Sequence, residues 1–433
     1  MVTETRSVTI KPEYKHTEVG IIPKDWNVLS IPEITKKRSD AIKIGPFGSQ
    51  LKKNLLVKSG YKVYGQENVY EKNMEVGDRY ISKDHFNKLK SCELVSGDFI
   101  ISMMGTIGKS MVVPENFKPG IMDSHLIRLR FDNKKIKKEL LLQIFDSRII
   151  LDQIIELSVG SIMEGLSSSI IRKIQIPLPK ETEEQSTIAQ VLSDTDDLIN
   201  SLDGLIEKKK NIKQGAMQEL LTGKRRLHGF KEQWKIEKLN KNSTLKARIG
   251  WQGLTTAEYL DIGDFYLITG TDFVNGKIYW QNCHYVSEHR YSQDPHIQLK
   301  TEDILITKDG TIGKVAFVER LRKPATLNSG VFVIRPKFDK YEPKFMYYVL
   351  SSVYFKDFLN RLSAGSTISH LYQKDFVDFE FPLPPSIEEQ NAITQVLSDM
   401  DAEIEELEKR RDKYLMLKKG MMQQLLTGRI RLR

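Results

Sequence analysis

The sequence predicts an α+β protein with two similar mixed α/β domains, separated by two long helices that form an antiparallel coiled coil. Two observations predict this fold. Similar stretches recur 205 residues apart along most of the chain, which indicates an internal repeat with pseudo-twofold symmetry. Each copy of the repeat also ends in a long segment whose apolar residues are spaced three and four apart, as in a coiled coil.

The repeat is clearest in short motifs. "IGPFGS" at Ile44 is matched by "IGWQGL" at Ile249, and "DFIISMMGTIGK" at Asp98 is matched by "DILITKDGTIGK" at Asp303. From 176 to 227, 26 of 52 positions are identical to their counterparts, whereas the preceding part of each copy has diverged further. Shared segments indicate a common role in both copies. A diverged surface on a common framework indicates two different targets that are recognised in the same way.

The first part of each copy has the pattern of a mixed α/β domain. Short apolar and β-branched runs are bounded by Gly, Pro and Asp, and a single apolar helix is expected to follow them. The expected strands lie in the runs that start at Tyr61, Asp98 and Ser124, and at Tyr266, Asp303 and Ser329. The expected packing helices are 137–157 and 342–362.

A long helix follows "IPLP" in the first copy and "FPLP" in the second. Gly223 and Gly428 are suited to end these helices, because glycine adopts the left-handed conformation that often caps a helix C-terminus. The expected coiled-coil contact positions are Ile188, Val191, Thr195, Leu198, Leu202, Leu205, Lys209, Ile212 and Ala216, and Ile393, Val396, Met400, Glu403, Leu407, Arg410, Tyr414, Leu417 and Met421.

These patterns predict four segments along the chain. The first domain with its N-terminal lead-in is expected at 1–180, and the first spacer helix at 181–227. The second domain is expected at 228–385, and the second spacer helix at 386–433.

Composition narrows the function class. The formal net charge is +9 and the isoelectric point is near 9.1, which is compatible with a polyanionic partner but does not establish one. Cys92 and Cys283 are not equivalent in the repeat, and two unpaired cysteines fit a reducing compartment. The N-terminus lacks a signal-peptide pattern, and no apolar run reaches the roughly 18 residues of a membrane helix. We therefore expect a cytoplasmic protein without a membrane partner.

The sequence offers no catalytic motif. "GTIGKS" at Gly105 resembles a phosphate-binding loop, but Met103 occupies the place of its first glycine, so a tight turn between strands is expected. Lys109 and Lys314 in these turns can contact phosphate or remain solvated. We find neither zinc-ligand spacing nor a glycine-rich cofactor fingerprint.

The two glycines of the opening motif are expected to form a sharp turn that both copies need, which leaves the side chains around them free to differ. Phe47 and Trp251 are the aromatic side chains of the two turns. They are either exposed for binding or buried in the core of each domain.

The order of these motifs, found twice, resembles the specificity subunits of type I restriction-modification enzymes. This resemblance implies two target recognition domains, each for one half of a bipartite double-stranded DNA site. It implies helices that fix the unread gap and dock two methyltransferase (modification) subunits, and restriction (translocase/endonuclease) subunits that join the complex. It also implies a non-catalytic chain that binds no cofactor, with S-adenosylmethionine, ATP and magnesium on the partner subunits.

Two other functions fit the sequence, a scaffold that holds two proteins and a solitary DNA-binding regulator. If the chain binds DNA, the candidate side chains lie in or near the repeated turns. They are Lys43, Phe47, Ser49, Gln50, Lys109 and Ser161 in the first copy, and Arg248, Trp251, Gln252, Lys314, Ser366 and His370 in the second.

Overall fold

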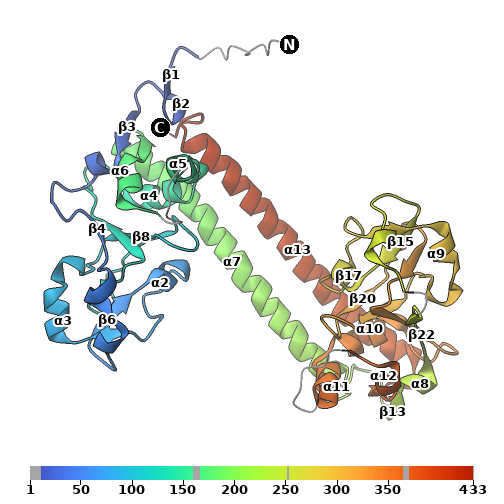
Figure 1. Cartoon of the computed structure of the whole chain (residues 1–433). Coiled ribbons are helices and arrows are strands. Elements are labelled where there is room, and N and C mark those ends of the chain that lie inside the picture. The colour runs from blue at the N-terminus through green and yellow to red at the C-terminus, as the bar shows by residue number, and fades with distance from the viewer. Residues whose placement is uncertain (1–10, 159–165, 251–252, 364–369, 433) are drawn as a thin grey trace. The chain divides into compact units, whose positions relative to one another are not determined.

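The computed structural model describes residues 11–158, 166–250, 253–363 and 370–432. The chain divides into two compact units (Figure 1). Unit 1 consists of Met1–Leu202 and Arg410–Arg433, and unit 2 consists of Asp203–Lys409. Each unit therefore contains one mixed α/β domain and a part of both long helices.

Two four-stranded sheets form the domain of unit 1. Sheet 1 is antiparallel with the order β4-β11-β8-β9, and it comprises β4 (Ile42–Ile44), β8 (Phe99–Ser102), β9 (Ser110–Val112) and β11 (Leu126–Leu129). Sheet 2 has the order β10-β6-β7-β5, and it comprises β5 (Leu56–Val57), β6 (Tyr61–Tyr64), β7 (Tyr80–Ile81) and β10 (Gly120–Met122). Two strand pairs complete the unit, β1 (Tyr14–Thr17) with β2 (Gly20–Pro23), and β3 (Asn27–Ser30) with β12 (Gln175–Leu178).

Sheet 1 is the central layer of unit 1, because alternate residues of its strands enter two different cores. Phe99 and Ile101 belong to a core shared with the helices, and Ile100 belongs to a core shared with sheet 2. The helices are α1 (Ile31–Ile34), α2 (Gln66–Tyr70), α3 (Lys83–Lys88), α4 (Lys138–Phe145), α5 (Arg148–Ser158), α6 (Ser168–Lys173) and the long helix α7 (Thr182–Leu220).

Unit 2 has the same architecture. Its sheets have the orders β14-β22-β19-β20 and β18-β15-β21. Its strands are β13 (Lys235–Lys238), β14 (Ser243–Ala247), β15 (Phe265–Ile268), β16 (Phe273–Val274), β17 (Lys277–Ile278), β18 (His284–Val286), β19 (Ile304–Thr307), β20 (Val315–Phe317), β21 (Ala325–Leu327), β22 (Val331–Pro336) and β23 (Glu380–Leu383). Its helices are α8 (Leu239–Asn242), α9 (Glu288–Ser292), α10 (Pro343–Ser351), α11 (Val353–Ser363), α12 (Gln373–Phe376) and the long helix α13 (Ile387–Leu425).

The packing helix expected at 137–157 is two helices, α4 and α5, and its counterpart in the second copy is α10 and α11. A serine stands at the equivalent break in each copy. The hydroxyl groups of Ser147 and Ser352 donate hydrogen bonds of 2.6 Å to the carbonyl oxygens of Ile144 and Val349. A serine that bonds the backbone of the preceding turn competes with helix continuation, which the apolar pattern alone does not reveal.

The two long helices run antiparallel within each unit, as predicted. In unit 1, Lys418 of α13 forms an ion pair of 2.6 Å with Asp196 of α7. In unit 2, Lys213 of α7 forms the equivalent ion pair of 2.5 Å with Asp401 of α13. Each lysine lies near the end of one helix and each aspartate near the start of the other, so the pairs fix the direction of packing.

Five of the eighteen contact positions predicted for the long helices are wrong, because they are exposed: Leu205, Ile212, Glu403, Arg410 and Leu417. Leu205 and Ile212 were expected in the seam, but they are 38% and 47% exposed, whereas their neighbour Ile206 is buried. On α13, Ile404 is buried in place of the expected Glu403, whereas the expected Val396 is partly buried beside the buried Leu397. Apolar residues stand in two adjacent columns of α7, so the spacing alone does not show which column faces the partner helix.

Each long helix begins with a buried glutamate that binds an arginine from the end of the other copy. In unit 2, Arg226 binds Glu389 through two hydrogen bonds of 2.5 and 2.7 Å, and the Trp234 indole donates a third. In unit 1, Arg431 binds Glu184 in the same way, and this pairing raises the pKa of Arg431. The glutamates also lie at the positive end of each helix dipole, which favours their charge.

Removal of one arginine should destabilise its unit strongly. The side chain of Glu389 is 1% exposed, so Arg226→Ala leaves a buried carboxylate without its counter-charge. We expect a loss of about 3 kcal/mol in the free energy of unfolding, measured by urea denaturation. Lys90→Ala removes the exposed ion pair with Glu93 and should cost less than about 1 kcal/mol. Equal losses for the two variants would contradict a structural role for the buried pair.

Candidate nucleic-acid interface

The loops that carry the candidate residues lie together at one end of the strands of sheet 1, which is called the edge of the unit below. Strands β4 and β8 end there, and β9 and β11 begin there, as their antiparallel registers require. The segments 45–50, 103–109 and 123–125 therefore meet at one edge of unit 1. In unit 2 the registers of β14, β22, β19 and β20 bring 308–314 and 328–330 together with the end of β14 in the same way.

A rigid turn between the third and fourth strands of each sheet lies at this edge. In unit 1 the Ser102 hydroxyl donates to the carbonyl oxygen of Thr106 at 2.7 Å and accepts from the Lys109 amide at 3.1 Å. In unit 2 Thr307 makes the same two bonds, at 2.5 and 2.9 Å. Gly105, Gly108 and their counterparts Gly310 and Gly313 have φ values between 64° and 82°, which favour glycine. The predicted tight turn is confirmed in both copies.

Backbone hydrogen bonds connect this turn to the other loops of the edge. In unit 1 the Met103 amide donates to the carbonyl oxygen of His125, and the Met103 carbonyl accepts from the Leu166 amide, both at 2.9 Å. In unit 2 Lys308 makes the equivalent bonds with Gly330 and Leu371, at 2.9 and 2.8 Å. Backbone contacts do not depend on side-chain identity, so the edge keeps its shape while its side chains change.

The glycine-containing turn of unit 1 needs its first glycine for close packing. A Cβ atom placed on Gly45 would lie 1.8 Å from the carbonyl oxygen of Asp123. The Gly45 amide also donates to the carbonyl oxygen of Leu126 at 3.2 Å. Gly48 has a φ of 53° and begins a short 3-10 helix, Gly48–Leu51. The turn therefore packs directly against the backbone at the start of β11.

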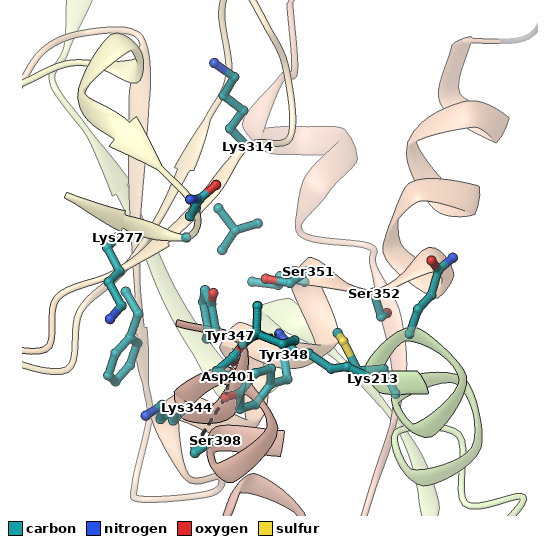
Figure 2. Close-up of a pocket in the computed structure, with 18 of the residues that line it drawn as sticks. Lys213, Lys277, Lys314, Lys344, Tyr347, Tyr348, Ser351, Ser352, Ser398 and Asp401 are labelled. Carbon is teal, nitrogen blue, oxygen red and sulfur yellow. Dashed lines mark hydrogen bonds and ion pairs between the residues drawn. The ribbon is translucent and has the colours of Figure 1, made fainter. Parts of the chain in front are cut away.

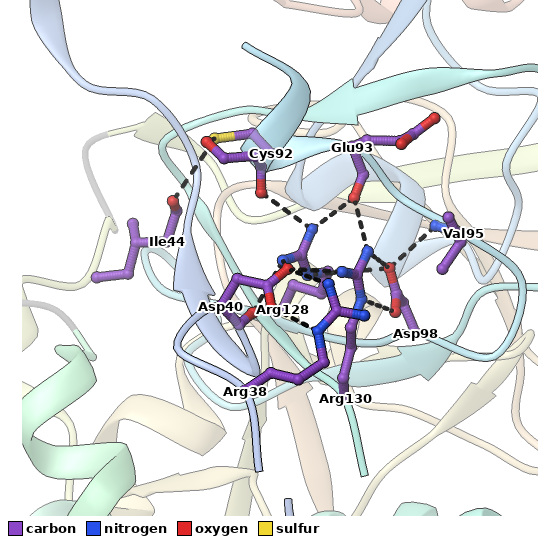
Figure 3. Close-up of polar contacts among 10 residues, drawn as sticks. Arg38, Asp40, Ile44, Cys92, Glu93, Val95, Asp98, Arg128 and Arg130 are labelled. Carbon is purple, nitrogen blue, oxygen red and sulfur yellow. Dashed lines mark hydrogen bonds and ion pairs between the residues drawn. The ribbon is translucent and has the colours of Figure 1, made fainter. Parts of the chain in front are cut away.

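A buried cluster of charges anchors the strand that leads to this turn (Figure 3). Arg128 of β11 is fully buried, and its guanidinium donates to the carbonyl oxygens of Glu93 and Asp40, at 2.5 and 3.0 Å. Arg130 binds the carboxylates of Asp98 and Asp40, both at 2.8 Å. Burial and the neighbouring Arg130 lower the pKa of Arg128. Asp40 lies two residues before β4, so the cluster connects the chain at the start of β4 to the neighbouring strands.

Only part of this cluster recurs in unit 2. Arg335 binds Asp303 at 2.6 and 2.7 Å, as Arg130 binds Asp98, and both pairs occupy equivalent positions of the repeat. Arg128 has no counterpart, because Val333 stands in its place. The shared pair thus belongs to the common framework, and the additional arginine belongs to unit 1.

The residues at the entry of the rigid turn differ sharply between the two copies, and sequence reasoning did not select them. Met103 and Met104 stand in unit 1, and Met104 is 42% exposed. Lys308 and Asp309 stand at the same positions in unit 2, where Asp309 pairs with the His370 imidazole. Their difference on an otherwise identical motif was the available signal. The edge is apolar at this point in unit 1 and charged in unit 2.

The candidates of unit 1 are largely solvent-accessible at this edge. Phe47 is 59% exposed, so the alternative that it is a core residue is wrong. Gln50 is exposed, and its carbonyl oxygen accepts a hydrogen bond of 2.7 Å from His85 Nε2. Lys43 lies on β4 and is partly exposed. The Lys109 ammonium group lies 3.9 Å from the Asp146 carboxylate. Ser161 lies outside the described residues, as does the side chain of Ser49.

The candidates of unit 2 divide into accessible and buried groups. Lys314 is exposed, and His370 is partly exposed with its ring packed against Tyr372 at a centroid distance of 4.5 Å. Arg248 is only 2% exposed and donates to the Leu327 carbonyl at 2.8 Å and the Thr326 hydroxyl at 3.1 Å. The structure therefore places Arg248 behind the edge, as a support for β21. Trp251, Gln252 and Ser366 lie outside the described residues.

Metal-ligand clusters and membrane-spanning helices were sought among the described residues. Within them, His, Cys, Asp and Glu side chains do not gather in groups of three or more that could hold a metal ion. None of the helices in the described part of the chain is long and apolar enough to cross a membrane. The edge can contact a ligand through mixed cationic, apolar and hydrogen-bonding side chains.

Comparison with known proteins identifies the family. The model of the type I restriction modification DNA specificity domain matches residues 23–214 and 252–415. The chain belongs to this family. The MjaVIII specificity subunit of a type I restriction enzyme from Methanocaldococcus jannaschii is 28% identical to it, over 73% of this chain and 76% of that protein.

Two solved structures share the fold. The S subunit of a type I restriction-modification system from M. genitalium superposes with a TM-score of 0.57 at 16% identity, over 96% of this chain and 98% of that one. A chain from a study of complex assembly and conformational transition of the type I R-M system gives a TM-score of 0.55 at 16% identity, over 94% and 99%.

Family membership settles the general function of the chain. It is a specificity subunit of a type I restriction-modification system, and it recognises DNA sequence. The scaffold and the solitary regulator, both compatible with the sequence, are not favoured by this membership. The two domains found by the internal repeat are the mixed α/β domains of the two units.

The seating of the Gly45 turn can be tested with two glycine variants. Gly45→Ala places a methyl group against the Asp123 backbone, which cannot move as a flexible side chain would, so we expect a loss of about 1–3 kcal/mol. Gly215→Ala on α7 meets nothing within 4 Å and should stabilise the chain by up to about 1 kcal/mol. Urea denaturation measures both. Unchanged stability of Gly45→Ala would show that the turn is not seated as described.

Proposed function

We propose that each domain recognises one half of a bipartite DNA site through the edge where the rigid turn and the glycine-containing turn meet. The observation that supports this proposal is that both units contain the same rigid turn, with different residues at its start. Contacts of a common framework can position each domain on the DNA backbone, and different side chains can then contact different base edges. Met104 offers an apolar contact, whereas Lys308 and Asp309 offer a donor and an acceptor.

The paired long helices are proposed to set the unread gap between the two half-sites. Each helix has 39 residues, which corresponds to about 58 Å at 1.5 Å per residue. The buried ion pairs at the start of α7 and α13 make each helix end part of a folded unit rather than a frayed terminus. A rigid rod attached at both ends is suited to hold a fixed length.

The same helices are proposed to dock two methyltransferase subunits. In unit 2, Leu205 and Ile212 leave apolar surface on α7, and in unit 1, Leu415, Met416 and Leu417 do so on α13. Met416 is 75% exposed, which is unusual for a large apolar side chain on a helix. Such a surface is suited to be covered by partner helices.

Catalysis is proposed to belong to the partner subunits. In this proposal the methyltransferase subunits bind S-adenosylmethionine, and the restriction subunits bind ATP and magnesium and join the same complex. The complex acts on double-stranded DNA in the cytoplasm. The specificity subunit contributes binding, orientation and the length of the gap.

Exchange of the turn entry residues tests the recognition proposal. In the complex with methyltransferase subunits, we expect Lys308→Met with Asp309→Met to change the base preference within one half-site. A contact to a base edge contributes about 1–3 kcal/mol of discrimination, so methylation of the original site should fall about fivefold or more. The corresponding variant of unit 1, Met104→Asp, should change the other half-site; Met103 is kept because its side chain is buried in the core. Methylome sequencing reports both, and unchanged half-sites in both variants would refute the assignment.

Lengthening one helix tests the spacer proposal. Four residues inserted between Glu207 and Lys208 add one turn, about 6 Å, to α7. We expect a gap that is longer by one or two base pairs, unchanged half-sites and reduced activity, because the added base pairs also rotate the half-sites around the duplex. Methylation that retains the original gap would exclude the helices as the determinant of its length.

A further inference from the structure

Unit 2 contains a cavity of about 1080 Å³ between the domain and its parts of the long helices. Its walls are formed by α7, α13, α10, α11, the β16–β17 hairpin and the turn that carries Lys314. Figure 2 shows Lys314 and Lys344 on opposite sides of Tyr347. Because Lys314 belongs to the rigid turn of the recognition edge, the cavity is continuous with that edge.

The acidic residues of the cavity are already neutralised by lysines. Lys277 lies 2.8 Å from Glu405 and 3.8 Å from Glu319. Lys213 pairs with Asp401 at 2.5 Å, and Lys210 pairs with Glu408 at 2.6 Å. The hydrogen bonds from Lys277 and Lys409 lower the pKa of Glu405 to about 2, so this carboxylate stays charged and paired at neutral pH.

Three further lysines leave the cavity lining with a net charge of +2, because six lysines face four carboxylates in all. Within the described part of the chain, the ammonium groups of Lys314, Lys344 and Lys356 form neither an ion pair nor a hydrogen bond, and Lys344 lies 6.0 Å from the centre of the Phe317 ring. Lys314 and Lys356 are exposed. Three ammonium groups around one open cavity attract an anion with several charges.

The equivalent positions of unit 1 have the opposite character. Glu139 stands at the position of Lys344, Leu151 at that of Lys356, and Asp146 at that of Ser351. Asp146 lies 3.9 Å from the Lys109 ammonium group, whereas Ser351 leaves Lys314 without a counter-charge. Arg148, at the position of Val353, is the one added cation among these positions. The excess of positive charge therefore belongs to the second copy.

We infer that this cavity of unit 2 binds phosphates of the DNA backbone next to the half-site that the second domain recognises, and that unit 1 has no equivalent contact. The inference rests on the proposed recognition function. Lysine ammonium groups act as point charges that suit phosphate oxygens, and they give no base specificity. The second domain thus holds its half-site with a larger share of electrostatic energy than the first.

The test is the salt dependence of DNA binding by the complex with methyltransferase subunits. Lys344→Gln with Lys356→Gln keeps most of each aliphatic stem and removes two charges. Each lost phosphate contact reduces the slope of log K against log salt by about 0.9. Between 50 and 200 mM salt, the affinity of this variant should therefore fall about 12-fold less than that of the unmodified complex, with the same methylated sequence.

The matched control carries Glu139→Gln with Leu151→Gln in unit 1, which should leave the slope unreduced. An unchanged slope in the unit 2 variant overturns the inference. Failure of that variant to assemble with methyltransferase subunits also overturns it, because the cavity would then bind an acidic protein segment instead of DNA. Failure of the proposed function itself would appear differently, as an absence of bipartite selectivity in the unmodified complex.

Discussion

The fold depends on an exchange of charges between the two copies of the repeat. An arginine that follows each long helix binds a buried glutamate that begins the other one, as Arg431 binds Glu184 and Arg226 binds Glu389. A buried carboxylate is tolerated only with its counter-charge, so neither helix start is satisfied by its own copy. The C-terminal end of each copy is thereby bound within the unit that contains the domain of the other copy. This closure explains why the segments around the helices have kept their sequence, since each contact needs matching residues in both copies.

The edge proposed to recognise DNA is held together differently. Its loops are held by backbone hydrogen bonds and by one hydroxyl in each turn, supplied by Ser102 or Thr307. These bonds fix the path of the chain whichever side chain stands at positions such as Met104 and Lys308. Substitutions should therefore cost little stability at the loop tips of this edge. They should cost more at the two arginine–glutamate pairs that join the ends of the long helices. The uneven similarity of the two copies is a direct consequence of this difference.

The sequence predicted the repeat, the two domains, the long helices and the tight turns, because each depends on local patterns. It failed where tertiary contacts decide between equal local choices. The seam of α7 has apolar residues in two adjacent columns, and only packing selects Ile206 over Leu205. Arg248 resembles a surface cation in sequence, yet its guanidinium is buried against β21. The cavity of unit 2 could not be predicted at all, because its lysines come from segments far apart in the chain.

The inequality of the two copies has a physical consequence for binding. Phosphate contacts steer a protein to DNA and hold it there with little regard for sequence, whereas base contacts discriminate at short range. A subunit with more phosphate contacts at one half-site can engage that half first and test the other half while it stays bound. If the helices set the gap as proposed, the second half-site is then found by a single further contact. Two domains with equal phosphate contacts would have no preferred order of binding. In the inferred arrangement, the extra phosphate contacts of unit 2 hold the complex on DNA while the base contacts of unit 1 test the other half-site.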